Sequence, residues 1–586
     1  MKYKNLNKWD NIASCTGLIL FSQLLEEMLF DFSLDTYKAS VMHTGLLCAE
    51  AIATIGEIES GNIKAPNIWH VNAELCANFE KDPVAQALIP LPPSAFFPAL
   101  KNTKSPLKEV DTVLRLLQVH MSVEKYRNKT EELLSAEIQG HQSLAQIRRL
   151  TRSYITSLVA VGFDQRFIRA EASRFFCYGT NRIANANAIM DFFAVFPMEF
   201  LEFNVIFRVD EIFEHLSDAL VSMGLVISRN LPAQINLSQY PNFKPANENK
   251  LFAIAEKVKA RDVHSARSNA EYRLKLSSTL LNLFHHKVNA TWRPECIVHD
   301  IEKDRYIQIS SPINAMHKCS DLLDSVASKR LSLLMSEFSL EQASFSKFIR
   351  SAQLHSMALA SNAYENQILN LWISLESLVP SETKLEDASN IEHIVNSLIP
   401  FLNIGYIERL LDDLVKNLLR WNRSATKAAL RGIIGRKFTE KLARLMALSE
   451  HADALIKLES TFGNFYLLRD RFEYIKGLLS KPANVVAALD AHKIRLEWQI
   501  RRIYRTRNII VHSGQTPSYT KSLIEHTHDY LDIVLSVLVR LASTPKSIQS
   551  VAQGFKYVEL KYELNYKAIS PKNLIFDSSN IEAILF

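Results

Sequence analysis

The chain contains little glycine: only 15 of its 586 residues are glycine, well below the share of roughly 7% in ordinary proteins. Glycine supplies the positive-φ turns and the close backbone approaches that phosphate-binding loops require. The scarcity therefore argues against Rossmann and P-loop folds, and neither G-x-G-x-x-G nor G-x-x-x-x-G-K-[ST] occurs in the sequence. Because helix interiors avoid glycine, the composition favours a mainly helical protein.

Cysteine pairs, long apolar runs and a strong charge imbalance are also lacking. The six cysteines show no C-x-x-C spacing, which argues against a zinc site or a disulfide framework and favours buried thiols in a reducing cytosol. No run of 18 apolar residues occurs, so no segment is predicted to span a membrane. The net charge of +6 permits nucleic-acid binding without demanding it. We expect a cytoplasmic protein without a cofactor or membrane contact.

The sequence pattern predicts a multi-domain helical protein with a small α+β module in its middle. Helical periodicity dominates both ends of the chain, and strand-like segments occur at 203–209, 296–301 and 306–310, the last two as a hairpin. Residues 230–248 are predicted to be a linker, and 249–290 two helices. The expected parts are an N-terminal helical domain (1–196), the α+β module (197–315), a C-terminal helical bundle (316–545) and a tail (546–586) whose alternating residues 557–564 suggest an edge strand.

The most informative segment is the basic stretch R-R-I-Y-R-T-R-N-I-I-V-H-S-G at 501–514. An apolar, basic helix precedes it, and Gly514 is a candidate C-cap, followed by Pro517 as an early residue of the next helix. His512 should therefore lie near an exposed helix end. In an ideal helix Arg507 and His512, five residues apart, lie about 140° apart around the axis. They can act at one point only if the helix loosens near Gly514 or a second copy completes the site.

Two segments resemble a known family. Arg507–His512 matches the R-N-x-x-x-H form of the signature of HEPN domains, and Glu365–Leu378 resembles the first helix of Apea-like HEPN proteins. The resemblance covers roughly 350–545. It implies a helical bundle that commonly dimerises and, in many members, a metal-independent ribonuclease of bacterial anti-phage or toxin systems. A phage-derived trigger or a neutralising partner protein would fit such a system, with 1–315 as its sensing or restraining part.

The resemblance implies RNA cleavage through the substrate's own 2′-OH. His512 would act as general base or acid, Arg507 would stabilise charge on the phosphoryl group, and Asn508 would position the phosphate or His512. The flanking basic residues would bind RNA, and residues of the upstream helix would support the site, with Glu365 and Glu376 as an acidic pair that faces the basic helix and orients its arginines. The RNA-binding set is Arg501, Arg502 and Arg505, and the supporting set is Glu365, Asn366 and Glu376.

Three alternatives remain open from the sequence. The protein could be a non-catalytic RNA- or nucleotide-binding scaffold that uses the same basic helix. Arg507 could instead pair with a carboxylate while His512 only caps a helix. An activity in the N-terminal half would also be compatible, although no motif there indicates one. The histidine pairs 285–286 and 526/528 have no carboxylate or cysteine at metal spacing, so no metal site is predicted.

Overall fold

The computed structural model describes residues 1, 3–39, 42–140, 143–240, 243, 251–287, 290–318, 322–543 and 547–585. The protein is mainly helical, with one five-stranded antiparallel sheet, as the composition predicts. None of the described helices has the length and apolar character needed to cross a membrane. Five cysteines are free thiols, four of them buried, and Cys319 lies outside the described residues.

The chain divides into two compact units that do not follow the predicted boundaries. The first unit contains residues 1–4, 19–129 and 314–586, and the second contains 5–18 and 130–313. The expected N-terminal domain, 1–196, is thus divided: residues 1–4 and 19–129 belong to the first unit, and the rest belong to the second. Helical periodicity shows which face of a helix is apolar, but not which distant segment covers that face.

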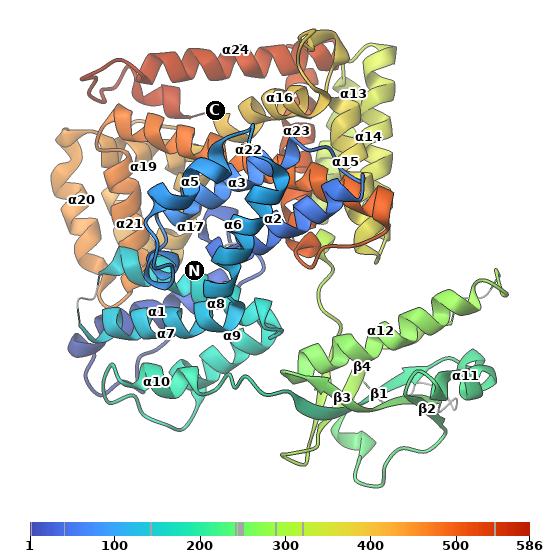
Figure 1. Cartoon of the computed structure of the whole chain (residues 1–586). Coiled ribbons are helices and arrows are strands. Elements are labelled where there is room, and N and C mark those ends of the chain that lie inside the picture. The colour runs from blue at the N-terminus through green and yellow to red at the C-terminus, as the bar shows by residue number, and fades with distance from the viewer. Residues whose placement is uncertain are drawn as a thin grey trace. The chain divides into compact units, whose positions relative to one another are not determined.

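The first unit consists of helices from both ends of the chain. Its N-terminal helices are α1 (Thr16–Met28), α2 (Thr44–Glu59), α3 (Asn67–Phe79), α4 (Pro83–Leu88), α5 (Pro93–Lys101), α6 (Leu107–His120) and α7 (Val123–Gln139). The division between the units falls within α1 and α7. Figure 1 shows α3 beside α22, with which it is in contact, and α2 packs on both α3 and α6.

The C-terminal helices of this unit begin at residue 324. They are α13 (Asp324–Glu337), α14 (Gln342–Ala360), α15 (Tyr364–Leu378), α16 (Asn390–Ile404), α17 (Tyr406–Trp421), α18 (Arg423–Ala429), α19 (Phe438–Ala447), α20 (Ala452–Glu459), α21 (Tyr466–Leu478), α22 (Pro482–Ser513), α23 (Thr520–Ala542) and α24 (Val551–Ile569). Helix α15 packs against α14, α22 and α23, and α16 packs against α22, α23 and α24. One continuous apolar core fills the space between these helices.

The predicted edge strand in the tail is wrong, because residues 557–564 lie within helix α24. The alternation that suggested a strand hides a stronger helical pattern. Val551, Gly554, Phe555 and Val558 are buried at spacings of three and four residues, which is the period of a helix face. Through Val551, Phe555 and Val558, α24 contributes to the core of the bundle.

The second unit combines helices with the predicted α+β module. Its elements are α8 (Leu144–Ala160), α9 (Gln165–Ser173), α10 (Ala188–Phe193), β1 (Leu201–Val209), α11 (Ser217–Val221), β2 (Leu225–Ser228), β3 (Phe252–Ala260), α12 (Val263–Leu281), β4 (Trp292–Asp300) and β5 (Arg305–Ile309). The strand order is β2-β3-β1-β4-β5, all antiparallel. Helix α12 covers one face of the sheet (Figure 1).

The predicted strand at 203–209 and the hairpin that β4 and β5 form are confirmed. The prediction of two helices over 249–290 is wrong for its first part, which is strand β3. Phe252, Ala253, Ala255 and Val258 are buried there on one or other face of the sheet, so the segment lacks a clean alternation. The predicted linker at 230–248 lies partly outside the described residues.

Candidate functional site

The basic motif occupies the C-terminal end of α22. Pro482 begins this helix at a position where no backbone N–H is needed, and the helix continues without interruption to Ser513. Gly514 ends it with a φ of 69°, and its N–H donates to the carbonyl oxygen of Ile510 at 3.0 Å. The predicted C-cap is confirmed. His512 is consequently in the last turn, and its side chain is exposed.

Pro517 lies in the turn before the next helix rather than inside it. Its carbonyl oxygen accepts from the backbone N–H and the hydroxyl of Thr520, the first residue of α23. Since α22 stays helical through Ser513, the loosening that would let Arg507 and His512 point at one spot is not present. In a regular helix they remain about 140° apart, which leaves a second copy of the motif as the way to combine them.

Arg507 is half-buried and pairs with no carboxylate in the described part of the chain. Its Nη1 donates to Oδ1 of the neighbouring Asn508 at 3.0 Å, so Asn508 orients the guanidinium. Its Nε is enclosed and has no hydrogen-bond partner among the described residues. An enclosed donor without a partner is costly and rare in native proteins. Arg507 thus keeps donor capacity that the fold itself does not use.

Arg502 and Arg505 lie in the interior, where they bind carboxylates of the N-terminal helices. Arg502 donates through Nε and Nη2 to both oxygens of Glu50 on α2, at 2.9 to 3.0 Å, and through Nη2 to Glu74 on α3 at 2.6 Å. Arg505 donates through Nη2 to Glu50 at 2.6 Å. Both arginine side chains are at most 5% exposed. This placement does not fit the RNA contact that the sequence predicted for them.

The opposite charges of this cluster keep Glu50 and Arg502 ionised although both are buried. Burial alone would raise the pKa of Glu50, but Arg502 and Arg505 outweigh it and hold that pKa at about 2. Burial alone would lower the pKa of Arg502, but Glu50 and Glu74 outweigh this effect and raise that pKa. Arg501, the third predicted RNA-binding arginine, is half-buried, and burial lowers its pKa. It is the one member of the predicted set outside the carboxylate cluster.

Helix α15, the second segment of the family resemblance, packs directly against the motif helix. Ile368, Leu371, Trp372 and Leu375 are buried on one stripe, and the Trp372 ring lies 5.5 Å from that of Tyr504 on α22. Trp372 therefore belongs to the apolar core of the bundle.

The predicted supporting residues take different roles from those expected. Glu365 accepts a 2.5 Å hydrogen bond from the hydroxyl of Thr516, in the connection between α22 and α23. Asn366 and Glu376 are exposed. The expectation that Glu365 and Glu376 orient the arginines is wrong for Arg502 and Arg505, which Glu50 and Glu74 bind.

Sequence reasoning missed Glu50 and Glu74, although one signal was present. Glu50 lies on the buried face of α2, together with Leu47, Ala51 and Thr54 at spacings of three and four residues. A carboxylate on an apolar face indicates a buried cationic partner. The identity of that partner, more than 450 positions away along the chain, is not encoded in any local pattern.

Comparisons of this chain with protein-family models, with curated proteins and with solved structures give no match.

Proposed function

We propose that this chain is a metal-independent endoribonuclease of the HEPN type, in which Arg507 and His512 act on RNA at a site shared by two copies. The observation that carries the proposal is the contrast among the arginines of α22. Two of them are neutralised by buried carboxylates, whereas Arg507 has no carboxylate partner in the described structure and keeps an enclosed, unused donor. A phosphate oxygen is a strong acceptor for a guanidinium group, and the Arg507 side chain is only partly buried.

The packing of α15 on α22 also supports this proposal. The two segments that carry the HEPN resemblance are separated by more than 100 residues in sequence. Helix α15 contacts residues on either side of the Arg507–His512 motif, through Trp372 with Tyr504 and through Glu365 with Thr516. The hydrogen bond to Thr516 lies only four residues beyond His512. Glu365 would therefore hold the connection that follows His512, which makes it a positioning residue.

The proposed reaction breaks one phosphodiester bond without a cofactor. One His512 takes the proton of the ribose 2′-OH, whose oxygen attacks the phosphorus and displaces the 5′-oxygen of the next nucleotide. The His512 of the second copy gives that leaving oxygen a proton, so that the products are a 2′,3′-cyclic phosphate and a free 5′-OH. Arg507 stabilises the negative charge that develops on the phosphoryl oxygens. A symmetric pair of motifs supplies both the base and the acid.

Cleavage of a fluorescent single-stranded RNA in the presence of EDTA tests this proposal. Arg507→Ala and His512→Ala should each lower the rate by about 100-fold or more, since general acid–base groups and oxyanion donors contribute on that scale. Lys493→Ala removes an exposed charge from the same helix and serves as the matched control, with near-normal cleavage. A substrate that lacks 2′-OH groups should remain intact.

Three results would contradict the proposal. Cleavage that persists in both variants would remove the site assignment. An absence of cleavage, together with RNA binding that survives His512→Ala but fails in Arg507→Ala, would favour the non-catalytic RNA-binding scaffold. Sedimentation of the active protein as a monomer would argue against the shared site.

A further inference from the structure

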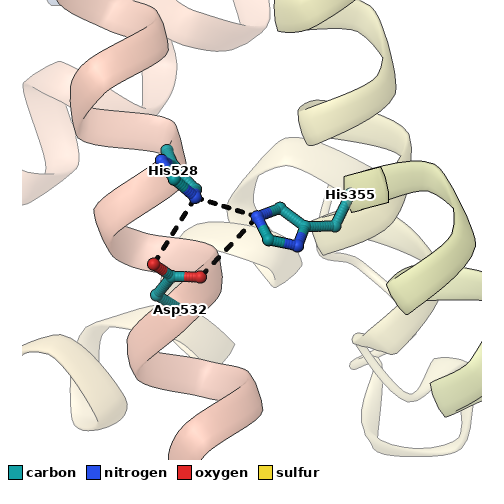
Figure 2. Close-up of side chains that lie close together, drawn as sticks. All are labelled: His355, His528 and Asp532. Carbon is teal, nitrogen blue, oxygen red and sulfur yellow. Dashed lines mark hydrogen bonds and ion pairs between the residues drawn. The ribbon is translucent and has the colours of Figure 1, made fainter. Parts of the chain in front are cut away.

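A cluster of two histidines and one aspartate joins helices α14 and α23, apart from the Arg507–His512 motif. Figure 2 shows His355 extending from α14 toward His528 and Asp532, which lie one turn apart on α23. The two Nε2 atoms are 2.8 Å apart. Asp532 lies 3.8 Å from His355 Nε2 through Oδ1 and 3.5 Å from His528 Nε2 through Oδ2. The prediction that His528 has no carboxylate at metal spacing is therefore wrong.

The ligand atoms of the three residues lie close enough together to bind one metal ion. Zinc binds imidazole nitrogen and carboxylate oxygen at about 2.0–2.2 Å, so neighbouring ligand atoms of a tetrahedral site lie about 3.3–3.5 Å apart. The two Nε2 atoms are 2.8 Å apart, and each faces a different oxygen of Asp532, at 3.5 and 3.8 Å. When each residue offers one ligand atom, the three atoms lie within 4.8 Å of one another. They can converge on a single ion if the imidazoles separate slightly and the Asp532 carboxylate turns one oxygen toward both of them.

The chemistry and surroundings of the cluster also suit a cation. Two imidazoles and one carboxylate form a common ligand set for divalent transition metals. The His528 side chain is 4% exposed, while Asp532 is 42% exposed. The site thus has a closed inner side and an open side, through which an ion and a water molecule could enter as the remaining coordination partner.

The neighbouring contacts fix the helix face that carries His355. Ser351, one turn before His355 on α14, shares a 2.7 Å hydrogen bond with Ser374 of α15, whose hydroxyl also lies 2.9 Å from the Ser351 carbonyl oxygen. On α23, the spacing of four residues places His528 and Asp532 on the same face. The ligand atoms are therefore largely preorganised before an ion binds, which lowers the cost of binding.

We propose that His355, His528 and Asp532 form a binding site for one divalent transition-metal ion, with Zn²⁺ as the best fit, which links α14 to α23. The site is independent of the proposed ribonuclease chemistry. His528 lies eight residues beyond Thr520, about 12 Å along the helix, and the cleavage mechanism uses none of the three ligands. The ion would act as a structural link in the bundle that positions the motif helix.

Titration of the full-length, chelator-treated protein with Zn²⁺ by calorimetry tests this proposal. The wild-type chain should bind one ion, and Zn²⁺ should raise its Tm. His355→Gln, His528→Gln and Asp532→Asn should each weaken binding by at least about 100-fold, since even changes outside the ligand set commonly cost 10–100-fold. Co²⁺ should give the intense visible spectrum of a tetrahedral site in the wild type only.

His526→Gln is the matched control. His526 is a buried histidine on the same helix, but it pairs with Asp35, 3.1 Å away, and its substitution should leave Zn²⁺ binding unchanged. Asp532→Asn changes a half-exposed side chain and should fold normally, so that its loss of binding cannot be attributed to unfolding.

The metal proposal is overturned if the wild type binds no Zn²⁺ at micromolar concentrations, or if the three ligand variants bind it as well as the wild type. The cluster would then be a histidine pair that shares a proton. Cleavage of RNA in EDTA is measured separately, so the two proposals can fail independently. Loss of RNA cleavage by the wild type in EDTA, while Asp532→Asn still cleaves RNA without EDTA, would contradict only the metal-independent mechanism, because that variant already lacks the structural ion.

Discussion

Gly514 ends helix α22 two residues after His512 and so places His512 in the last turn of the helix. Its φ of 69° belongs to the left-handed region, which costs other residues roughly 1–2 kcal/mol. A Cβ placed there meets no atom within 4 Å, so the cost of Gly514→Ala is conformational and not steric. We expect this variant to lower the free energy of unfolding by about 1 kcal/mol, measured as a shift of the urea midpoint.

Gly56→Ala provides the control for this measurement. Gly56 lies inside α2, and a Cβ there also meets no atom within 4 Å. Because alanine favours the helix, that substitution should stabilise the protein by about 0.5–1 kcal/mol. Equal shifts in the two variants would contradict a left-handed cap at Gly514.

Glu50 is the residue on which the buried charge cluster depends. Glu50→Gln would leave Arg502 and Arg505 only partly compensated in the interior, and we expect a loss of about 3 kcal/mol at pH 7. The folded pKa of Glu50, about 2, lies below its ordinary value of 4.5. Its contribution is therefore complete above about pH 5.5 and is lost as the pH falls from there toward 2.

The variant should consequently lose stability at pH 7 and show a weaker dependence on pH between 5 and 3. Urea unfolding at several pH values measures both effects. Glu74 shares Arg502, but burial raises its pKa, so its contribution to the pH dependence has the opposite sign. Glu59→Gln, an exposed carboxylate on the same helix, should change stability by no more than about 0.5 kcal/mol. A similar loss in both variants would remove the special role of Glu50.

At the scale of elements, the sequence predicted those with a strong local signal. The C-terminal part of α22 with its Gly514 cap, and the hairpin of β4 and β5 around a short polar turn, were predicted. Strand β3 was not predicted, because its residues are buried on both faces of the sheet. Helix α24 was not predicted, because its residues 557–564 alternate in polarity although the helix buries a single face. Burial on both faces removes the alternation that identifies a strand, and a half-exposed helix can imitate that alternation by chance.

At the candidate site, too, the sequence predicted the features that depend on neighbouring residues and not those that depend on tertiary packing. The helix end, the exposed His512 and the cap follow from residues within one turn of each other. The partners of Arg502 and Arg505 do not, because tertiary packing selected Glu50 and Glu74 in place of the nearer Glu365 and Glu376. The cluster of His355, His528 and Asp532 also depends on the packing of α14 against α23. The sequence alone shows only that His528 and Asp532 are four residues apart.

At the scale of the whole molecule, the N-terminal helices belong to the same compact unit as the C-terminal bundle. A fragment of residues 314–586 would keep Arg502 and Arg505 in its interior without Glu50. We expect this fragment to unfold without cooperativity and to bind a hydrophobic dye, since uncompensated buried charges are strongly destabilising. Adding residues 1–129 in trans should restore a cooperative transition.

A fragment of residues 197–313 provides the comparison. It contains the sheet and α12 with their own apolar core, and it should show a cooperative transition alone in circular dichroism. Cooperative unfolding of the isolated 314–586 fragment, at the midpoint of the full chain, would show that the N-terminal helices do not contribute to the stability of the bundle.

The buried pairing of Arg502 and Arg505 has a further consequence for any polyanion that approaches α22. The charges of these two guanidinium groups are neutralised by fixed carboxylates inside the protein and not by mobile ions. An RNA strand that docks on this helix therefore gains no ion-release entropy from them. Of the four arginines between 501 and 507, only Arg501 and Arg507 remain to make its binding sensitive to salt.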